Sequence, residues 1–314
     1  MKQKLSRLSF FSVISPGLFV LFILCPVISR AATISITTEA APMVADTFLV
    51  RINLNTDGAE INAIEGGIEI SSSGEAVKVQ DISLGGSALE LWPDKPSLSV
   101  EGKKVMVYFT GGTPAGFNKA EALLFTLALT TTEPEDIIIS PLQLVAYASD
   151  GQGSPMAVSG DSLNLKIEQS TAAPKNEWQN FVAVDHLPPE SFRITFGQDP
   201  YVAAGQKFLS FNAVDSGSGL DHYEVSEGDR PTVRSNDMYI LADQTNPAAV
   251  KVVAYDKAGN GREEKWQPPQ APAVPRVTKI NVIMAVIKII GLILTLILTA
   301  ILLIKLFKWK KIKK

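Results

Sequence analysis

The sequence predicts an all-β protein with two consecutive β-sandwich domains and one C-terminal transmembrane helix. Short runs that alternate between apolar and polar residues fill residues 32–168, and a second set fills residues 176–267. Such runs are typical of strands, and many short strands with frequent turns are typical of antiparallel sandwiches. An almost uninterrupted apolar run at residues 280–304 is long enough to cross a bilayer as a helix.

Residues 1–31 have the pattern of a secretory signal peptide. Three cationic residues precede an apolar run, and Ser29-Arg30-Ala31 supplies small residues for cleavage, so we expect the mature protein to begin near Ala32. An uncleaved anchor is the alternative, but two prolines and a glycine interrupt a run that is shorter than the ~20 residues of a span. The only cysteine, Cys25, lies in this segment, and the mature chain therefore depends on packed cores rather than disulfides.

One turn of the first sandwich imitates a calcium-binding loop. Oxygen-bearing side chains alternate from Asn53 to Asp57 and are followed by Gly58, as at the start of such a loop. However, the first position is Asn, and Ile64 occupies the twelfth position, where a bidentate Glu is needed. A hairpin turn between two strands is the favoured interpretation.

Three connecting or terminal segments follow from composition. Residues 169–175 are small and polar and predict a linker. Residues 268–279 are rich in proline and predict a stiff, extended stalk. Residues 305–314 form a basic tail with six lysines, which the positive-inside rule places in the cytoplasm.

The apolar run itself predicts a single-pass protein of the plasma membrane with its N-terminal domains outside the cell. At ~1.5 Å per residue its helix reaches about 35 Å, so membrane lipid surrounds it. Lys288 interrupts the run. We favour a lysine that snorkels to the outer interface over a functional intramembrane charge, because the segment contains no acidic partner.

The exterior part of the chain is strongly acidic. All 32 Asp and Glu lie between the two ends, whereas four of the 29 Lys and Arg lie in the N-terminal segment and seven in the C-terminal helix and tail. The exterior therefore carries a charge of about −14. An acidic surface argues against nucleic-acid binding and suits cations or basic partners.

The first sandwich resembles a cohesin domain, the family whose members bind dockerin modules in cellulosomes and other surface assemblies. The resemblance covers nearly all of residues 32–168. It rests on the order and spacing of residues 45–50, 61–66, Trp92-Pro93, 109–112, Gly116-Phe117 and 124–127. It implies a jelly-roll sandwich that recognises a dockerin-like protein partner through one sheet face.

The second sandwich resembles bacterial immunoglobulin-like surface repeats. The resemblance rests on residues 215–220, which precede a strand, and on residues 254–260 near its end. In that family the second motif closes the last hairpin, where Asp, Gly and Asn tolerate unusual backbone angles. The resemblance implies an immunoglobulin-like fold that acts as a spacer.

Trp92 and Phe117 are the candidate residues for binding a partner or a glycan. Together with Phe109 they form either an exposed aromatic platform or part of the core, and aromatic residues in strands are more often buried. Trp92 directly precedes Pro93 in a predicted loop that also contains Pro96, and a Trp in such a loop is harder to bury than one in a strand. A cell-surface polysaccharide is the alternative to a protein partner.

Three acidic loop residues of the second sandwich are candidates for a structural calcium ion. Asp215, Asp221 and Asp256 carry the oxygen ligands that hard cations prefer, although turn formation alone also explains them. No other cofactor is expected.

The sequence gives no support for catalysis. It contains two histidines, no cysteine beyond Cys25, and no nucleophile-elbow or phosphate-loop pattern. We therefore expect a non-catalytic, surface-anchored binding or display protein. A carbohydrate-binding adhesin and an envelope structural protein that use the same sandwich are the alternatives.

Overall fold

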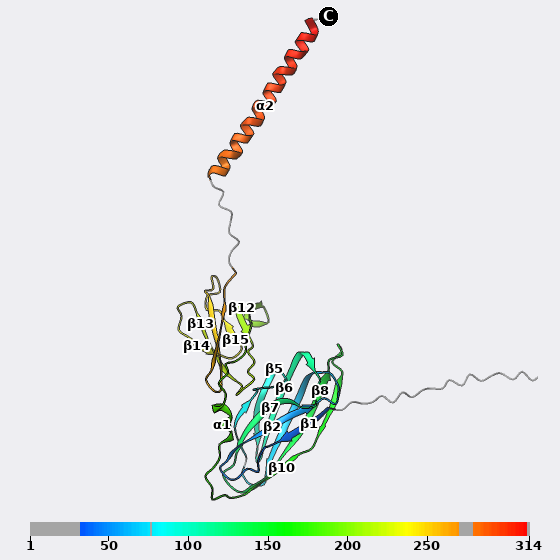
Figure 1. Ribbon diagram of the computed structural model, residues 1–314, viewed down its shortest axis with the longest axis vertical. Helices are drawn as coiled ribbons and strands as arrows, with labels where there is room; N and C mark the ends of the chain where they lie inside the picture. The colour runs from blue at the N-terminus through cyan, green and yellow to red at the C-terminus, as the bar shows by residue number, and fades with distance from the viewer. Residues whose placement is uncertain (1–31, 76, 270–278, 313–314) are drawn as a thin grey trace, which may run out of the picture. The chain divides into compact units, whose positions relative to one another are not determined.

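The computed structural model describes residues 32–75, 77–269 and 279–312 (Figure 1). The predicted signal peptide, most of the predicted stalk and the end of the basic tail lie outside the described residues. The chain divides into one compact unit that ends at Trp266 and a second that begins at Gln267. Strands dominate the first unit, and a long apolar helix makes up the second, so the predicted all-β class with a C-terminal helix is confirmed.

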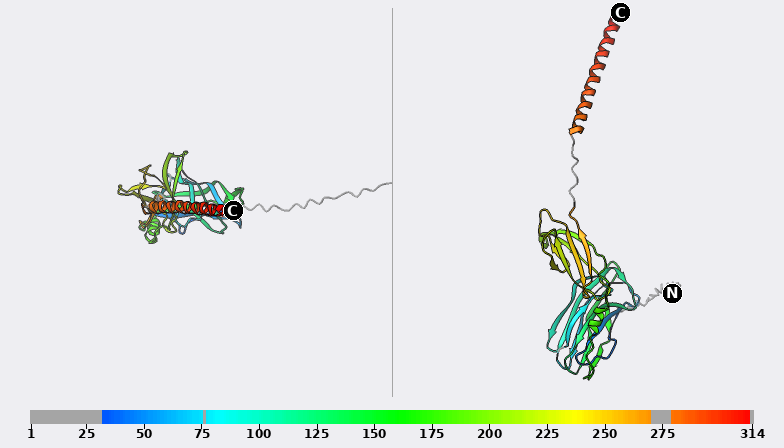
Figure 2. Two further views of the ribbon diagram at one scale, coloured as in Figure 1. Left: turned by 90° about the horizontal axis from the view of Figure 1, so that it is seen from above. Right: turned by 60° about the vertical axis from the view of Figure 1, so that its left-hand side comes forward.

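The first module (residues 32–168) consists of ten strands in one continuous sheet with the order β4-β7-β2-β1-β9-β8-β3-β6-β5, and β10 pairs with β8 beside this path. Its strands are β1 (Ala32–Thr37), β2 (Thr47–Asn55), β3 (Ile61–Ser72), β4 (Lys78–Ser83), β5 (Leu91–Glu101), β6 (Lys104–Phe117), β7 (Ala122–Thr130), β8 (Glu135–Ala148), β9 (Pro155–Gly160) and β10 (Leu163–Ile167). The sheet folds over at β9, which pairs in parallel with β1 and antiparallel with β8. Two layers result, β4-β7-β2-β1 and β8-β3-β6-β5 (Figures 1 and 2).

The two layers enclose one apolar core. Strand β1 alternates strictly between buried and exposed residues, as a strand with one wet face must. Ile52 and Phe125 from one layer and Ile68 and Val107 from the other are all fully buried in this core. The sequence therefore forms a sandwich because each layer can bury its apolar face only against the other.

The connection from Asn55 to Ile61 is a turn, but it is not a hairpin. Asp57 and Gly58 have φ angles of 48° and 74°, the left-handed region that Asp and Gly tolerate. Strand β2 pairs with β1 and β7, whereas β3 pairs with β6 and β8. The turn thus carries the chain from one layer to the other, and β2 and β3 bury their apolar faces in the same core from opposite sides.

The second module (residues 176–267) packs a three-stranded sheet, β11-β12-β15, and a four-stranded sheet, β14-β13-β16-β17, around a second core. Its strands are β11 (Ile194–Asp199), β12 (Val202–Phe211), β13 (Leu220–Glu227), β14 (Val233–Ser235), β15 (Met238–Ile240), β16 (Val250–Asp256) and β17 (Gly261–Trp266). As expected, the motif at residues 254–260 closes the hairpin between β16 and β17. A short helix, α1 (Glu177–Ala183), precedes the strands and was not expected; the Asn176 side chain caps it by accepting from the Gln179 N–H.

The predicted linker is bonded to the first module rather than free of it. The Thr47 N–H donates to the Lys175 carbonyl, and the Lys175 N–H donates to Asp46 at 2.7 Å. Glu177 is the first residue of α1, and one of its carboxylate oxygens accepts from the Leu49 N–H at 2.9 Å. The segment that leaves the first module therefore runs beside the start of strand β2, where Thr47 forms a parallel bridge with Asn176.

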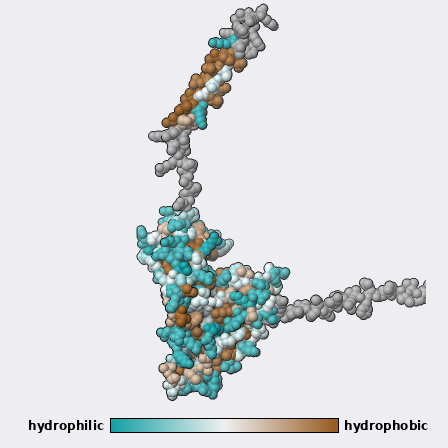
Figure 3. Space-filling model, viewed as in Figure 1, coloured by the Kyte–Doolittle hydropathy of each residue, from teal (hydrophilic) through white to brown (hydrophobic). Residues whose placement is uncertain are grey.

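Helix α2 (Lys279–Ile312) is the predicted transmembrane segment. Residues Ile283–Lys305 are long and apolar enough to cross a bilayer, with a mean hydropathy of 2.8, and this stretch is unburied in the structure. Figure 3 shows that apolar residues cover most of the coloured part of this helix, with a few pale and hydrophilic residues among them. Length and composition therefore fit a single membrane span.

Candidate functional site

The outer face of the layer β8-β3-β6-β5 has an aromatic and aliphatic centre. The register places Tyr108, Gly67 and Leu142 side by side on β6, β3 and β8. In the next row Thr110, Glu65 and Val145 are aligned in the same way. Tyr108 is 45% exposed although it lies in the middle of the sheet. We call this surface the outer sheet face; it is made by the side chains of residues 65, 69, 106, 108, 142, 145 and 147.

Gly67 allows Tyr108 to lie flat on the sheet. A Cβ atom at Gly67 would come within 3.1 Å of the Tyr108 ring, closer than ordinary contact. The hydroxyl group of Tyr108 reaches along its own strand to the Met106 sulfur at 3.6 Å. The ring is therefore held in place while much of it stays open to a partner.

Acidic side chains flank this apolar centre. Glu65 accepts a hydrogen bond from the Tyr147 hydroxyl at 2.5 Å, and this bond raises the pKa of Tyr147. Glu69 pairs with Lys104 at 3.0 Å across β3 and β6. The outer sheet face therefore suits a partner that combines apolar side chains with cations.

A β-bulge makes the outer sheet face uneven. Gly66 has a φ of 136° and Gln143 a φ of 49°, and the pairing of β3 with β8 shifts register there. A Cβ atom at Gly66 would meet the Gln143 carbonyl oxygen at 2.8 Å, so only glycine fits this close approach. A groove of about 380 Å³ lies beside the bulge, between Tyr108 and Leu142.

The two aromatic candidates from the sequence behave differently. Phe117 is 7% exposed and belongs to the core, as does Phe109 at 2%, so the expectation that Phe117 contacts a partner is not supported. Trp92 lies in strand β5 rather than in a loop. Pro93 and Pro96 lack the N–H that a ladder needs, and the pairing of β5 with β6 shifts register twice around them.

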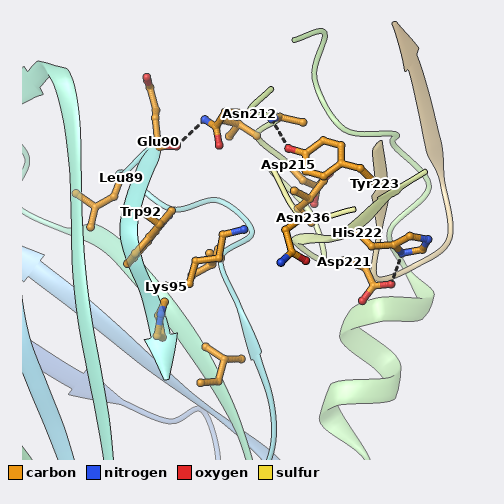
Figure 4. Close-up of a pocket in the computed structure, with 16 residues that line it drawn as sticks. Leu89, Glu90, Trp92, Lys95, Asn212, Asp215, Asp221, His222, Tyr223 and Asn236 are labelled. Atoms are coloured by element: carbon orange, nitrogen blue, oxygen red, sulfur yellow. Dashed lines mark hydrogen bonds and ion pairs between the residues drawn. The ribbon is translucent and has the colours of Figure 1, made fainter. Parts of the chain in front are cut away.

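Trp92 lines a hollow at the junction of the two modules (Figure 4). The hollow has a volume of about 210 Å³ and is bounded by residues 82–96 of the first module and 212–236 of the second. The Asn212 side chain donates to the Glu90 carbonyl at 2.9 Å and so closes one side. Trp92 therefore lies where both modules meet, a position that its predicted loop did not reveal.

The structure brings two of the three predicted calcium ligands together. Asp215 and Asp256 lie with Asp185 in one group, in which a carboxylate oxygen from each residue is within 4.8 Å of the others. Asp221 does not join them. Its carboxylate pairs instead with Arg234 at 2.9 Å and with His222.

The cluster of Asp185, Asp215 and Asp256 is tied to backbone groups of the same loops. Asp215 accepts from the N–H groups of Gly217 and Gly219, the latter at 2.6 Å. Burial raises the pKa of Asp215, and the charges of Asp185 and Asp256 raise it further against these hydrogen bonds. Among the described residues, none of the three carboxylates has a Lys or Arg partner.

Asp185 keeps its charge more easily. Burial opposes its ionisation, but hydrogen bonds from Ser218, at 2.6 Å, and from Leu187 outweigh burial and lower its pKa. Adjacent carboxylates of this kind match the donors that calcium prefers, although calcium takes six to eight oxygens and would need others besides these.

We expect calcium to raise the melting temperature and the Asp215→Asn variant to abolish that response. Because the pKa of Asp215 is raised in the folded state, its protonated form stabilises the fold. This stabilisation is fully present below the pKa of the carboxyl in the unfolded chain, and it is lost as pH rises through the raised pKa of the folded state. The calcium response should therefore be larger at pH 8 than at pH 5. A cation at 100 times its dissociation constant stabilises by about 2.7 kcal/mol.

Asp221→Asn is the matched control for this measurement by differential scanning fluorimetry. It removes a nearby charge of the same type from outside the cluster. Without calcium at pH 8, Asp215→Asn should be no less stable than the parent, because Asn still accepts from Gly217 and Gly219 and one like charge is gone. A calcium response that survives in Asp215→Asn contradicts the expectation.

Comparison with known proteins gives similarity at the level of structure only. No family model matches the chain, and no curated protein matches it. A non-cellulosomal cohesin from Archaeoglobus fulgidus is 18% identical, with a TM-score of 0.33; the match covers 44% of this chain and 91% of that one. A cohesin module from a Clostridium perfringens family 33 glycoside hydrolase is 15% identical, with a TM-score of 0.34, over 45% and 99% of the two chains.

A third solved structure is a type III cohesin module from the cell-surface anchoring scaffoldin ScaE of Ruminococcus flavefaciens. It is 12% identical, with a TM-score of 0.32, and the match covers 45% of this chain and 89% of that chain. Similarity this low does not assign the chain to a family. The three solved structures named above are cohesin modules, whereas another match, with a TM-score of 0.26 and 13% identity, is AvmM, which catalyses macrocyclization in alchivemycin A biosynthesis.

Proposed function

We propose that this chain is a non-catalytic, membrane-anchored surface protein whose first module captures a protein partner on the outer sheet face. The observation that carries the proposal is the exposed centre of that face, where Tyr108 is 45% exposed and lies over Gly67 between acidic residues. Large, rigid aromatic side chains of this kind dominate the binding energy of protein interfaces. The resemblance of the first module to cohesins makes a dockerin-like module the proposed partner.

The rest of the chain is proposed to display this module. The signal peptide directs export, helix α2 holds the protein in the plasma membrane, and the lysine-rich tail stays in the cytoplasm. The second module and the proline-rich segment after it then serve as a spacer. The bonded linker between Asp46 and Lys175 supports a spacer that holds the first module firmly.

The test is binding of the full-length protein to purified dockerin-bearing proteins of the same organism, measured by surface plasmon resonance with calcium present. We expect Tyr108→Ala to weaken binding at least about thirtyfold, because truncation of a central interface aromatic costs about 2 kcal/mol or more. Tyr201→Ala is the matched control, since Tyr201 is 98% exposed on the second module. Equal effects of the two substitutions, or no binding by the parent, would rule out capture by this face.

A further inference from the structure

A second, more open space lies next to the hollow at the module junction. The open part has a volume of about 600 Å³ and is bounded by residues 91–93 of the first module and by strands β11, β12 and β15 of the second. Trp92 and Asn212 line both spaces. We call the two together the junction groove.

Trp92 is a fixed aromatic surface in this groove. Its ring lies against Gly111, where a Cβ atom would come within 2.9 Å of it. The Phe109 ring supports it from the core, with centroids 6.3 Å apart and planes tilted by 60°. Because only glycine leaves this space, Trp92 is held in one orientation while it remains partly exposed.

The Tyr223 hydroxyl group is a buried donor without an acceptor. Tyr223 is 1% exposed, and its oxygen accepts from the Ala213 N–H at 2.7 Å. Within the described part of the chain no group accepts its hydroxyl hydrogen. Figure 4 shows this hydroxyl directed toward the hollow. A buried donor left unpaired is costly, and a ligand oxygen in the hollow would satisfy it.

Further polar groups face the hollow with free bonding capacity. In the described residues, the Lys95 amine and the Asn236 amide make no hydrogen bond or ion pair, and the Asn212 side-chain oxygen accepts none. Figure 4 shows Lys95 and Asn236 on opposite sides of the hollow. The hollow thus offers donors and acceptors around an aromatic surface. A hydroxyl group is the ligand group that uses both at once.

The charges and the size of the groove narrow the class of ligand. The hollow is lined by Lys95 and by the acidic residues Glu90, Asp215 and Asp221, and the open part by Arg193 and Asp237. Negative charge therefore prevails in the groove and disfavours an anionic ligand. A volume of about 210 Å³ is below the ~300 to 1,000 Å³ of sites for drug-sized molecules, and therefore suits one small ring. The open part leaves room for further units of the same chain.

We propose that the junction groove binds a neutral oligosaccharide, with one sugar ring against Trp92 in the hollow and the rest of the glycan along the open part. The C–H groups of the ring lie on the negative face of the indole, and its hydroxyls pair with Tyr223, Asn236 and Lys95. The site needs residues of both modules. It is separate from the outer sheet face, so glycan binding and protein capture can fail independently.

The test uses the full-length protein in lipid nanodiscs, because maltoside detergents carry sugar head groups. An array of neutral hexose and pentose oligosaccharides identifies glycans that are retained, and isothermal titration calorimetry then measures their affinity. We expect Tyr223→Phe, which removes one oxygen, to weaken binding about tenfold, and Trp92→Ala to abolish it. Tyr108→Phe on the outer sheet face is the matched control and should bind as the parent does.

The double variant Lys95→Ala/Asn236→Ala keeps the test decisive should Trp92→Ala fail to fold, since both side chains are exposed and unpaired among the described residues. It should weaken binding by at least about tenfold. Retention of no neutral glycan, or an affinity that neither Tyr223→Phe nor the double variant changes, overturns the proposal. Loss of the protein partner in Tyr108→Ala with glycan binding intact would show that the two sites are distinct.

Discussion

Replacement of Gly85 by alanine should open the junction between the two modules and split one thermal unfolding transition into two. Gly85 is buried, and a Cβ atom there would overlap the carbonyl oxygen of Gly217 in the second module. The two modules also approach closely in the other direction, since a Cβ at Gly219 would meet the Ser83 hydroxyl at 2.8 Å. Backbone cannot yield as a flexible side chain can, so the modules must separate.

Two measurements check this prediction. Differential scanning calorimetry should show the two transitions, and small-angle scattering should show a larger maximum dimension for the fragment that ends at Trp266. Gly102→Ala is the control, because no atom lies within 4 Å of the added Cβ; only its φ of 62° makes the substitution unfavourable. It should lower stability by about 1 kcal/mol and leave the scattering unchanged. One cooperative transition in Gly85→Ala would show that the junction tolerates the overlap.

Phe117→Ala should destabilise the first module by about 3 to 5 kcal/mol. The side chain is 7% exposed in the core, where Phe117 pairs with Ile61 at the end of β6. Its removal leaves a cavity that the surrounding strands can fill only in part. Urea denaturation measures the loss through a lower midpoint with an unchanged slope.

Phe196→Ala is the matched control for Phe117→Ala. Phe196 is 41% exposed and stacks on Trp266 at the surface of the second module, so its truncation should cost far less. If Phe117→Ala instead retained its stability and lost the protein partner, the side chain would serve binding and the core assignment would be wrong.

The strands of the fold were predictable because each strand is marked by its own local sequence pattern. The alternation in residues 105–109 identifies β6, and the Asp, Gly and Asn residues at 256–260 identify the hairpin that follows β16. Which strands pair with one another was not predictable. The residues between Asn55 and Ile61 do not indicate that β2 and β3 belong to different layers. That choice depends on which faces meet across the core, and a single turn does not encode it.

The sites were less predictable, for three separate reasons. Tyr108 occupies an outward position of an alternating run, and this alternation is the sequence signal that marks it as exposed. Asp185 lies 30 residues before Asp215 in a stretch without strand pattern, so only the folded chain shows that their carboxylates converge. Trp92 was expected to be exposed in a loop, whereas the two prolines bend a strand and bring it to the junction.

The bonded linker bears on how such a protein can arise by recombination. A gene segment that ended at residue 168 would encode the first module without Lys175 and Glu177, whose contacts satisfy backbone and side-chain groups of Asp46, Thr47 and Leu49. A second module inserted elsewhere would carry the Gly217 loop without the Gly85 surface that receives it. Recombination would therefore have to move the two modules as a pair. Exchange of either module alone would require new contacts between the modules.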